Sequence, residues 1–198
     1  MGATESRDLL RDTPLAALGL NRRAWVNPTP HGLRIGKTDF AFLGAMEMEI
    51  FMQNLKKIPS FEKDHLNMQP GFSLSDTDGG GVSTFDLRFK RPNAGDFIAP
   101  GALHSIEHIL ATVLRSGERA ADIVYFGPMG CRTGFYLLSR NLTEDGARAL
   151  LILSLEEGLK LSSVPGSGMS ECGNHLEHDL AGAKAEMRAY LSLLEAGA

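Results

Sequence analysis

Residues 103–114, LHSIEHILATVL, constrain the fold of this chain of 198 residues more than any other stretch. Apolar residues recur along it at the spacing of a helix. They are Leu103, Ile106, Leu110 and Val113. With about 3.6 residues per turn, four polar residues fall together on the opposite side, namely His104, Glu107, His108 and Arg115. The stretch therefore predicts an amphipathic helix that is apolar on one side and carries ionisable groups on the other.

The remaining pattern predicts an α+β fold. Runs rich in β-type residues border Gly- or Pro-containing turns in 71–81, 82–90, 122–126 and 133–139. In 82–90, apolar and charged residues alternate, which predicts a half-buried strand. Further helices are expected at 143–161, with Thr143 as its cap, and at 176–196. Because strands and helices do not strictly alternate, the sequence favours an antiparallel β-sheet covered by helices over a doubly wound fold.

Composition and charge limit the partners. With 43% hydrophobic and 22% charged residues, the chain has the balance of a water-soluble globular protein with one core. The formal net charge is -4 and the basic residues form no stripe, so we expect no nucleic acid partner. No apolar run reaches membrane-spanning length, and the N-terminus lacks the apolar core of a signal peptide. We therefore expect a cytoplasmic protein that has no membrane partner and acts on a small molecule or a protein.

Residues 1–51 differ from the rest of the chain because they show no sustained helical or alternating period. We expect an N-terminal extension, followed by the main domain at 52–198. The codons of Met48 and Glu49 necessarily contain the run GGA shortly before the Met52 codon, which resembles a translated ribosome-binding site. Our hypothesis is that Met52 is the true start, so that 1–51 is a misassigned leader or else a disordered arm.

The polar side of the helix has the spacing of a metal site. Histidines four residues apart can direct their ring nitrogens at one ion, and a carboxylate at the third position falls beside it. His104, His108 and Glu107 have this spacing, although an exposed polar face would show it too. Further ligand candidates are Cys131, Cys172, His65, His175 and His178, and spacing alone does not choose among them. The last two lie on a charged helix start, so they are expected in solvent.

The two cysteines, Cys131 and Cys172, are expected to be reduced in a cytosolic protein. Cys131 lies in a glycine turn and precedes Arg132, an arrangement that exposes a thiol and stabilises its thiolate, which suits an acid/base or nucleophilic role. Cys172 is then expected to be the metal ligand. Both would be inert if they were simply small buried apolar residues. Arg88, on the polar side of its strand, either binds an anionic or polar substrate or solvates a sheet face.

Several segments together resemble the S-ribosylhomocysteine lyase (LuxS) family, which produces the precursor of the quorum-sensing signal autoinducer-2. They are SFEKDH (60–65), TFDLRF (84–89), LHSIEH (103–108), FGPMGCRTGFYLL (126–138) and ECGN (171–174). The resemblance runs from about Met52 to the C-terminus. It implies a homodimer of α+β subunits that splits S-ribosylhomocysteine into homocysteine and 4,5-dihydroxy-2,3-pentanedione by carbonyl migration and β-elimination. The same reaction recycles a by-product of methylation, as a step of the activated methyl cycle.

The resemblance also implies roles for particular residues. One Fe(II) per subunit, replaceable by Zn(II), would be held by His104, His108 and Cys172. Glu107 and Cys131 would be the two acid/base residues. A substrate pocket built across the dimer interface would be lined by Ser60, His65, Arg88 and Arg115. One departure concerns the position six residues before the turn cysteine, where some family members have an acidic residue and this chain has Tyr125. This departure bears on how the amino-acid end of the substrate is held.

Two other functions fit parts of the pattern. The segment HSIEH matches the inverted H-x-x-E-H motif of zinc metallopeptidases, with Glu107 as the base, but it leaves both cysteines without a role. Alternatively, the two helix histidines and the two cysteines could form a closed structural site in a non-enzymatic metal or redox sensor. An open coordination position would distinguish an enzyme from such a sensor.

Overall fold

Strands of alternating apolar and polar residues form a four-stranded antiparallel sheet with the order β1-β2-β4-β3. The computed structural model describes residues 49, 52–56 and 58–197. Its strands are β1 (Gly71–Thr77), β2 (Ser83–Arg88), β3 (Ile123–Pro128) and β4 (Gly134–Ser139). Phe85 pairs with Leu137 and Leu87 with Phe135, so these four side chains point to the same face of the sheet. The predicted antiparallel α+β class is confirmed.

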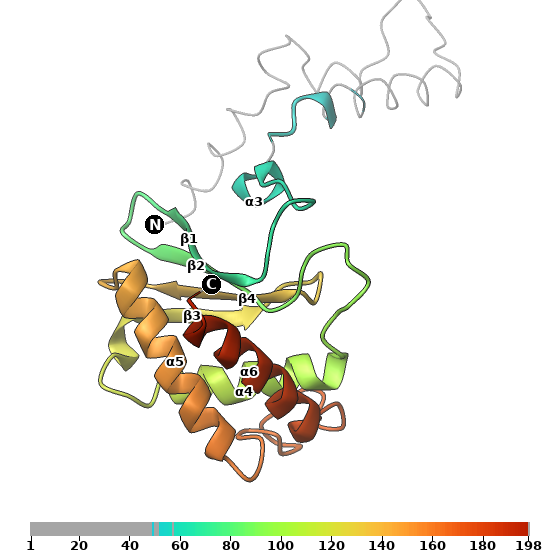
Figure 1. Cartoon of the computed structure of the whole chain (residues 1–198), viewed down its shortest axis with the longest axis vertical. Coiled ribbons are helices and arrows are strands. Elements are labelled where there is room, and N and C mark those ends of the chain that lie inside the picture. The colour runs from blue at the N-terminus through green and yellow to red at the C-terminus, as the bar shows by residue number, and fades with distance from the viewer. Residues whose placement is uncertain (1–48, 50–51, 57, 198) are drawn as a thin grey trace, which may run out of the picture. The chain divides into compact units, whose positions relative to one another are not determined.

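Helices cover that apolar face, as Figure 1 shows. They are α4 (Pro100–Leu114), α5 (Glu144–Lys160) and α6 (Leu180–Glu195), whereas α3 (Pro59–Glu62) and the 3-10 turn η2 (Ala120–Asp122) are short. The cap of α5 is Thr143, as predicted, because its side chain accepts a hydrogen bond from the backbone N–H of Gly146 at 3.1 Å. Helix α4 begins three residues before the predicted 103–114, since Pro100 suits a first helical turn.

The predicted start of α6 at Leu176 is wrong. Asp179 is the N-cap, and its carboxylate accepts a hydrogen bond from the backbone N–H of Gly182 at 2.8 Å, so the helix begins at Leu180. Residues 176–178 belong to the preceding loop. This shift changes where the histidines of that loop lie.

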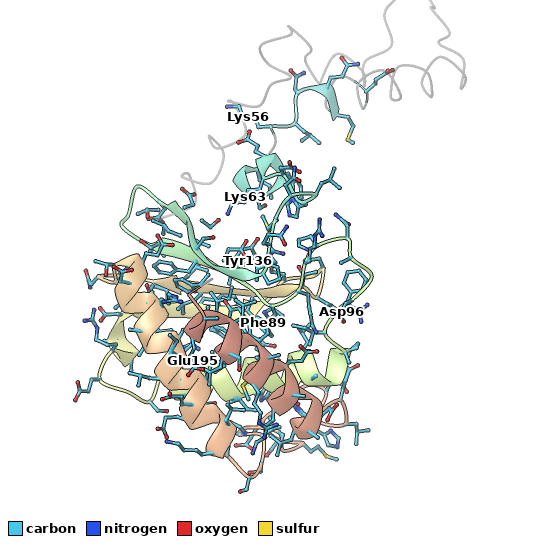
Figure 2. All side chains as sticks on the ribbon, in the orientation of Figure 1. Lys56, Lys63, Phe89, Asp96, Tyr136 and Glu195 are labelled. Carbon is cyan, nitrogen blue, oxygen red and sulfur yellow. The ribbon has the colours of Figure 1, made fainter. Side chains whose placement is uncertain are left out.

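The core lies between the sheet and the helices. Ile106 and Leu110, from the predicted apolar stripe, are fully buried. Phe89 stacks on Tyr190 of α6 with ring centroids 3.8 Å apart. Figure 2 shows Phe89 on the helix side of the sheet and Tyr136 on the opposite side. One face of the sheet thus packs into the core, and the opposite face carries Asp86 and Tyr136.

The expectation that β2 is half-buried is wrong. Residues 85–89 are all buried, and Asp86 and Arg88 each expose only 3% of their surface. The two side chains form a buried bidentate ion pair, in which Arg88 Nη2 and Nε donate to the two carboxylate oxygens of Asp86 at 2.7 and 3.1 Å. A pocket of about 250 Å³ over this pair is lined by residues 68–73. Arg88 therefore does not solvate a sheet face.

The chain divides into two units, Met1–Lys56 and Lys57–Ala198. The expected extension 1–51 lies outside the described residues except for Glu49. Within the described part, no helix is both long and apolar enough to cross a membrane.

Candidate metal centre and active site

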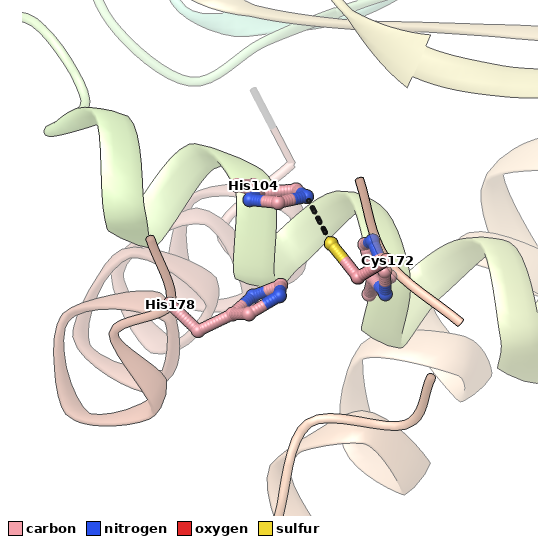
Figure 3. A group of neighbouring side chains, drawn as sticks. His104, Cys172 and His178 are labelled. Atoms are coloured by element: carbon pink, nitrogen blue, oxygen red, sulfur yellow. Dashed lines mark hydrogen bonds between the residues drawn. The ribbon is translucent and has the colours of Figure 1, made fainter. Parts of the chain in front are cut away.

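Helix α4 presents His104 and His108 one turn apart, and the loop before α6 brings Cys172 and His178 against them. One ligand atom from each of these residues lies within 4.8 Å of all the others. The sulfur of Cys172 is 3.4 Å from His104 Nε2, the contact dashed in Figure 3. The structure thus brings together the three predicted ligands, His104, His108 and Cys172. Their role in holding a metal stays a prediction.

Backbone carbonyls fix which ring nitrogen of each α4 histidine is free. His104 Nδ1 lies 2.9 Å from the carbonyl oxygen of Glu177, and His108 Nδ1 lies 3.0 Å from that of Pro165. A carbonyl can only accept, so each Nδ1 carries the proton and each Nε2 keeps its lone pair. Metal-bound histidines typically show this arrangement. Gly166 supports it, since its φ of +65° turns the chain directly after Pro165 and a Cβ there would meet His108 Nδ1 at 3.4 Å.

Cys172 supplies a sulfur donor in a protected position. Its residue surface is 8% exposed, and the backbone N–H of Asn174 points at its sulfur from 3.4 Å. The backbone N–H of Asn174 can therefore donate a hydrogen bond to this sulfur. Two imidazoles and a thiolate suit Zn(II) or Fe(II), whereas Ca²⁺ and Mg²⁺ prefer oxygen. The residues present fit the divalent ion that the resemblance implies.

His178 lies in this cluster, so the expectation that it faces solvent is wrong. Its ring stacks on that of His104, with centroids 4.1 Å apart and planes at 25°. Its Nε2 is buried and makes no hydrogen bond to the described residues. Burial, together with the neighbouring His104 and His108, lowers the pKa of His178 below its usual value, which keeps the ring neutral. His175, by contrast, is half-buried and is not part of the cluster.

The position of His178 follows from the cap of α6. The backbone N–H of Asp179 is 2.8 Å from Ser105 Oγ and 3.1 Å from the carbonyl oxygen of Gly101, both in α4. These hydrogen bonds hold the residue before Asp179 against α4. A sequence signal for this exists, since Asp179 precedes an amphipathic run and has the residue type of an N-cap.

Cys131 lies on the turn between β3 and β4 and is exposed. Its sulfur is 3.0 Å from Thr133 Oγ1 and 3.9 Å from Arg88 Nη1, which itself donates to Thr133 Oγ1 at 2.6 Å. Partial burial acts to raise the pKa of the Cys131 thiol, but the hydrogen bonds from Thr133 and the charge of Arg88 outweigh it and lower that pKa. The predicted thiolate character is therefore supported by electrostatics.

The prediction that Arg132 stabilises the Cys131 thiolate is wrong, whereas a backbone hydrogen bond within the turn, at Thr133, does lower the pKa of Cys131. Arg132 directs its guanidinium carbon over the ring of Phe97, 5.7 Å from the ring centroid, a cation–π contact. Arg88, from a strand 43 residues earlier, takes its place beside the sulfur.

The Cys131 turn lies next to the start of α4. The backbone N–H of Ile98 donates to the carbonyl of Arg132 at 3.0 Å, and α4 begins two residues later. Glu107, one turn beyond His104, is half-buried. Its carboxylate makes no hydrogen bond or ion pair with the rest of the described chain. The turn that carries Cys131 is thus hydrogen-bonded to the segment that leads into α4, the helix of Glu107.

The residues expected to line a substrate pocket do not all gather in this chain. Ser60 is half-buried in α3, and His65 Nδ1 lies 2.9 Å from the carbonyl oxygen of Lys63. Arg115 caps α4 and donates to the carbonyls of Ala111 and Val124, at 3.2 and 3.4 Å. At about 1.5 Å per residue it lies some 16 Å along the helix from His104. Arg88 is the one of these four residues that contacts Cys131.

Comparison with known proteins shows the family to which this chain belongs. A family model described as S-Ribosylhomocysteinase (LuxS) matches residues 58–196. The chain is 44% identical over 146 residues to a protein of Borreliella afzelii, an alignment that covers 71% of this chain and 93% of the relative. It is 43% identical over 147 residues to one of Phocaeicola vulgatus, covering 69% and 89%, and 39% identical over 150 residues to one of Clostridium acetobutylicum, covering 71% and 93%. Each of these relatives is named S-ribosylhomocysteine lyase. The chain belongs to the S-ribosylhomocysteinase (LuxS) family of enzymes.

Proposed function

We propose that this enzyme is a metal-dependent lyase that splits S-ribosylhomocysteine into homocysteine and 4,5-dihydroxy-2,3-pentanedione. The observation that carries the proposal is the convergence of His104, His108 and Cys172, whose ligand atoms lie within 4.8 Å of one another. Relatives that align over most of their length carry the lyase name. The lowered pKa of Cys131 adds a group that gives up its proton more readily than an ordinary thiol.

His104, His108 and Cys172 would hold the metal, for which we propose Fe(II), one per subunit, with Zn(II) able to substitute. When bound, the ion supplies Lewis acidity that polarises oxygen atoms of the sugar, without a change of redox state. The donor set is consistent with either ion.

The protein's own residues would move the protons. Homocysteine can leave only after the carbonyl group has moved along the sugar. The ketone must be separated by one carbon from the carbon that bears the sulfur. In this proposal the Cys131 thiolate removes protons from carbon, and Glu107 transfers protons to and from the sugar oxygens. The last proton removal, from the carbon between the ketone and the C–S carbon, expels homocysteine as its C–S bond breaks with both electrons on sulfur. The departing thiolate then takes up a proton.

Ser60, His65, Arg88 and Arg115 would line the substrate pocket across the interface of a homodimer. Because Arg88 is already engaged by Asp86 and Thr133, we assign it a second task, that of keeping Cys131 ionised. Tyr125 is exposed at the position where some relatives carry an acidic residue, so it would contact the amino-acid end of the substrate differently. We place the reaction in the cytoplasm, in autoinducer synthesis and the activated methyl cycle.

One observation favours a second candidate, a closed metal site in a non-enzymatic sensor. His178 adds a third nitrogen and thus a fourth ligand atom to the cluster, and a closed tetrahedral site has four protein ligands. The orientation of the His178 ring distinguishes between these two functions. No comparable observation favours the metallopeptidase.

The test is to incubate the anaerobically purified full chain with S-ribosylhomocysteine and to titrate free thiol. We expect thiol release by the native protein. Cys131→Ser should keep the metal and the fold but lower the release by several orders of magnitude, because a serine alkoxide is too basic to form near neutral pH. Cys172→Ser should instead lose the metal.

Metal lost in Cys131→Ser and kept in Cys172→Ser would mean that the roles of the two cysteines are reversed. Thiol release that survives in both variants would refute the mechanism.

A further inference from the structure

The two α4 histidines and His178 differ in the orientation of their rings. An imidazole nitrogen binds a metal along its lone pair, which lies in the ring plane. The planes of His104 and His108 meet at 80°, so lines drawn in both planes can cross at one point. Those of His104 and His178 meet at only 25°, with centroids 4.1 Å apart, so these two rings are stacked face to face, as Figure 3 shows. A metal placed about 2 Å from a ring nitrogen of each of these two histidines would lie well out of the plane of at least one ring.

The Nδ1 atoms of His104 and His108 face carbonyl oxygens, which can only accept, whereas that of His178 faces a group that can also donate. Its Nδ1 faces a hydroxyl, Ser105 Oγ, at 3.3 Å, and not a carbonyl. Ser105 Oγ already accepts a hydrogen bond from the backbone N–H of Asp179 at 2.8 Å, so the hydroxyl proton is free to be donated to His178 Nδ1. In a neutral ring, that hydrogen bond would place the proton of His178 on Nε2. A protonated nitrogen cannot bind a metal.

His178 Nε2 is buried and has no hydrogen-bond partner among the described residues, so with the proton in this position it would be a donor without an acceptor. Leaving a buried donor unpaired costs about 1–3 kcal/mol, so a group in this position indicates an acceptor that the protein itself does not supply. The neighbouring His104, His108 and Cys172 would supply a metal with three protein ligands. The fourth position of a tetrahedral site would then be taken by a non-protein atom.

We propose that His178 is not a fourth metal ligand but a positioning residue, which donates a hydrogen bond from Nε2 to the oxygen or anion that occupies the non-protein position of the metal. Its ring also stacks on His104 and keeps that ligand in orientation. The inference rests on the proposed metal-dependent function and deepens it. Helix α4 therefore carries the ligands His104 and His108 as well as Ser105, which orients the ring of His178.

The experiment uses the full chain loaded with Co(II), whose visible spectrum reports the coordination, and azide as the probe of the non-protein position. His178→Phe keeps a stacking ring but removes the N–H, whereas His178→Gln keeps an N–H donor at a similar reach. His175→Phe, a change of the same kind outside the cluster, is the control. Co(II) affinity is measured by competition with a chelator, azide affinity by spectral titration, and folding by circular dichroism.

We expect all variants to bind one Co(II) with affinities within a few-fold of the native protein and to keep its thiolate-to-cobalt band, because no ligand is lost. Azide should bind His178→Phe about tenfold more weakly, which corresponds to about 1.4 kcal/mol. His178→Gln should recover most of that loss, and His175→Phe should match the native chain.

Two results would overturn the proposal. A Co(II) affinity that falls by 100-fold or more in both His178→Phe and His178→Gln, with the fold intact, would make His178 a ligand and support the closed site. Equal azide affinity in the native chain and His178→Phe would show that His178 donates no hydrogen bond to the bound anion. Failure of the proposed function itself would look different, because the native chain would then bind no Co(II) or release no thiol.

Discussion

Replacing Arg88 by Met should strongly destabilise the fold, because Asp86 would lose its paired cation while staying buried. The two side chains are each 4% exposed, and the guanidinium meets both carboxylate oxygens, at 2.7 and 3.1 Å. Removing one partner of such a pair costs about 3–5 kcal/mol. That is a large part of a typical stability of about 5–15 kcal/mol. With a urea m-value of about 2 kcal/mol/M, the unfolding midpoint should fall by about 2 M.

The assay is urea unfolding followed by circular dichroism at equal metal content. The matched control is Arg119→Met, the same substitution in the pair Arg119–Asp122, where Arg119 is 46% exposed. That change should cost no more than about 1 kcal/mol. The double variant Asp86→Leu/Arg88→Met removes both charges and should recover at least half of the loss. Equal losses in Arg88→Met and Arg119→Met would refute the reasoning, since Asp86 would then not depend on Arg88.

The other predictions concern the site and the N-terminus. Thr133→Val removes a hydrogen bond that lowers the pKa of Cys131, so that pKa should rise and the pH profile of Cys131 alkylation should move to higher pH; an unmoved profile would exclude Thr133 as a cause. His108→Ala should lose metal and thiol release together, because two remaining ligands bind a divalent ion weakly, and metal analysis will show whether any ion is retained. Deleting residues 1–51 should leave thiol release nearly unchanged, as measured by thiol titration, and a large loss would give this segment a role in the pocket.

Several features of this protein could be predicted from local sequence. The helix around residues 103–114 was predicted because its apolar residues recur at helical spacing, which also placed His104 and His108 on one side. The cap at Thr143 and the strands beside the Cys131 turn were predictable for the same reason, since a cap or a tight turn depends on residues only a few positions apart. The assignment of Cys172 as a ligand followed from the acid/base role expected for Cys131, and the family resemblance implied the same assignment. The structure places the Cys172 sulfur 3.4 Å from His104 Nε2.

The tertiary structure alone decided the surroundings of these groups. His178 enters the cluster because Asp179 is bound to Ser105, 74 residues earlier in the chain. Arg88, and not the adjacent Arg132, approaches Cys131, because sheet pairing sets Arg88 of β2 opposite Gly134, just after the cysteine turn. Residues 68–73, which come earlier in the chain, line one pocket together with Asp86 and Arg88. Sequence periodicity depends on residues within about one helical turn or one strand. It therefore cannot predict contacts that form only when distant segments fold together.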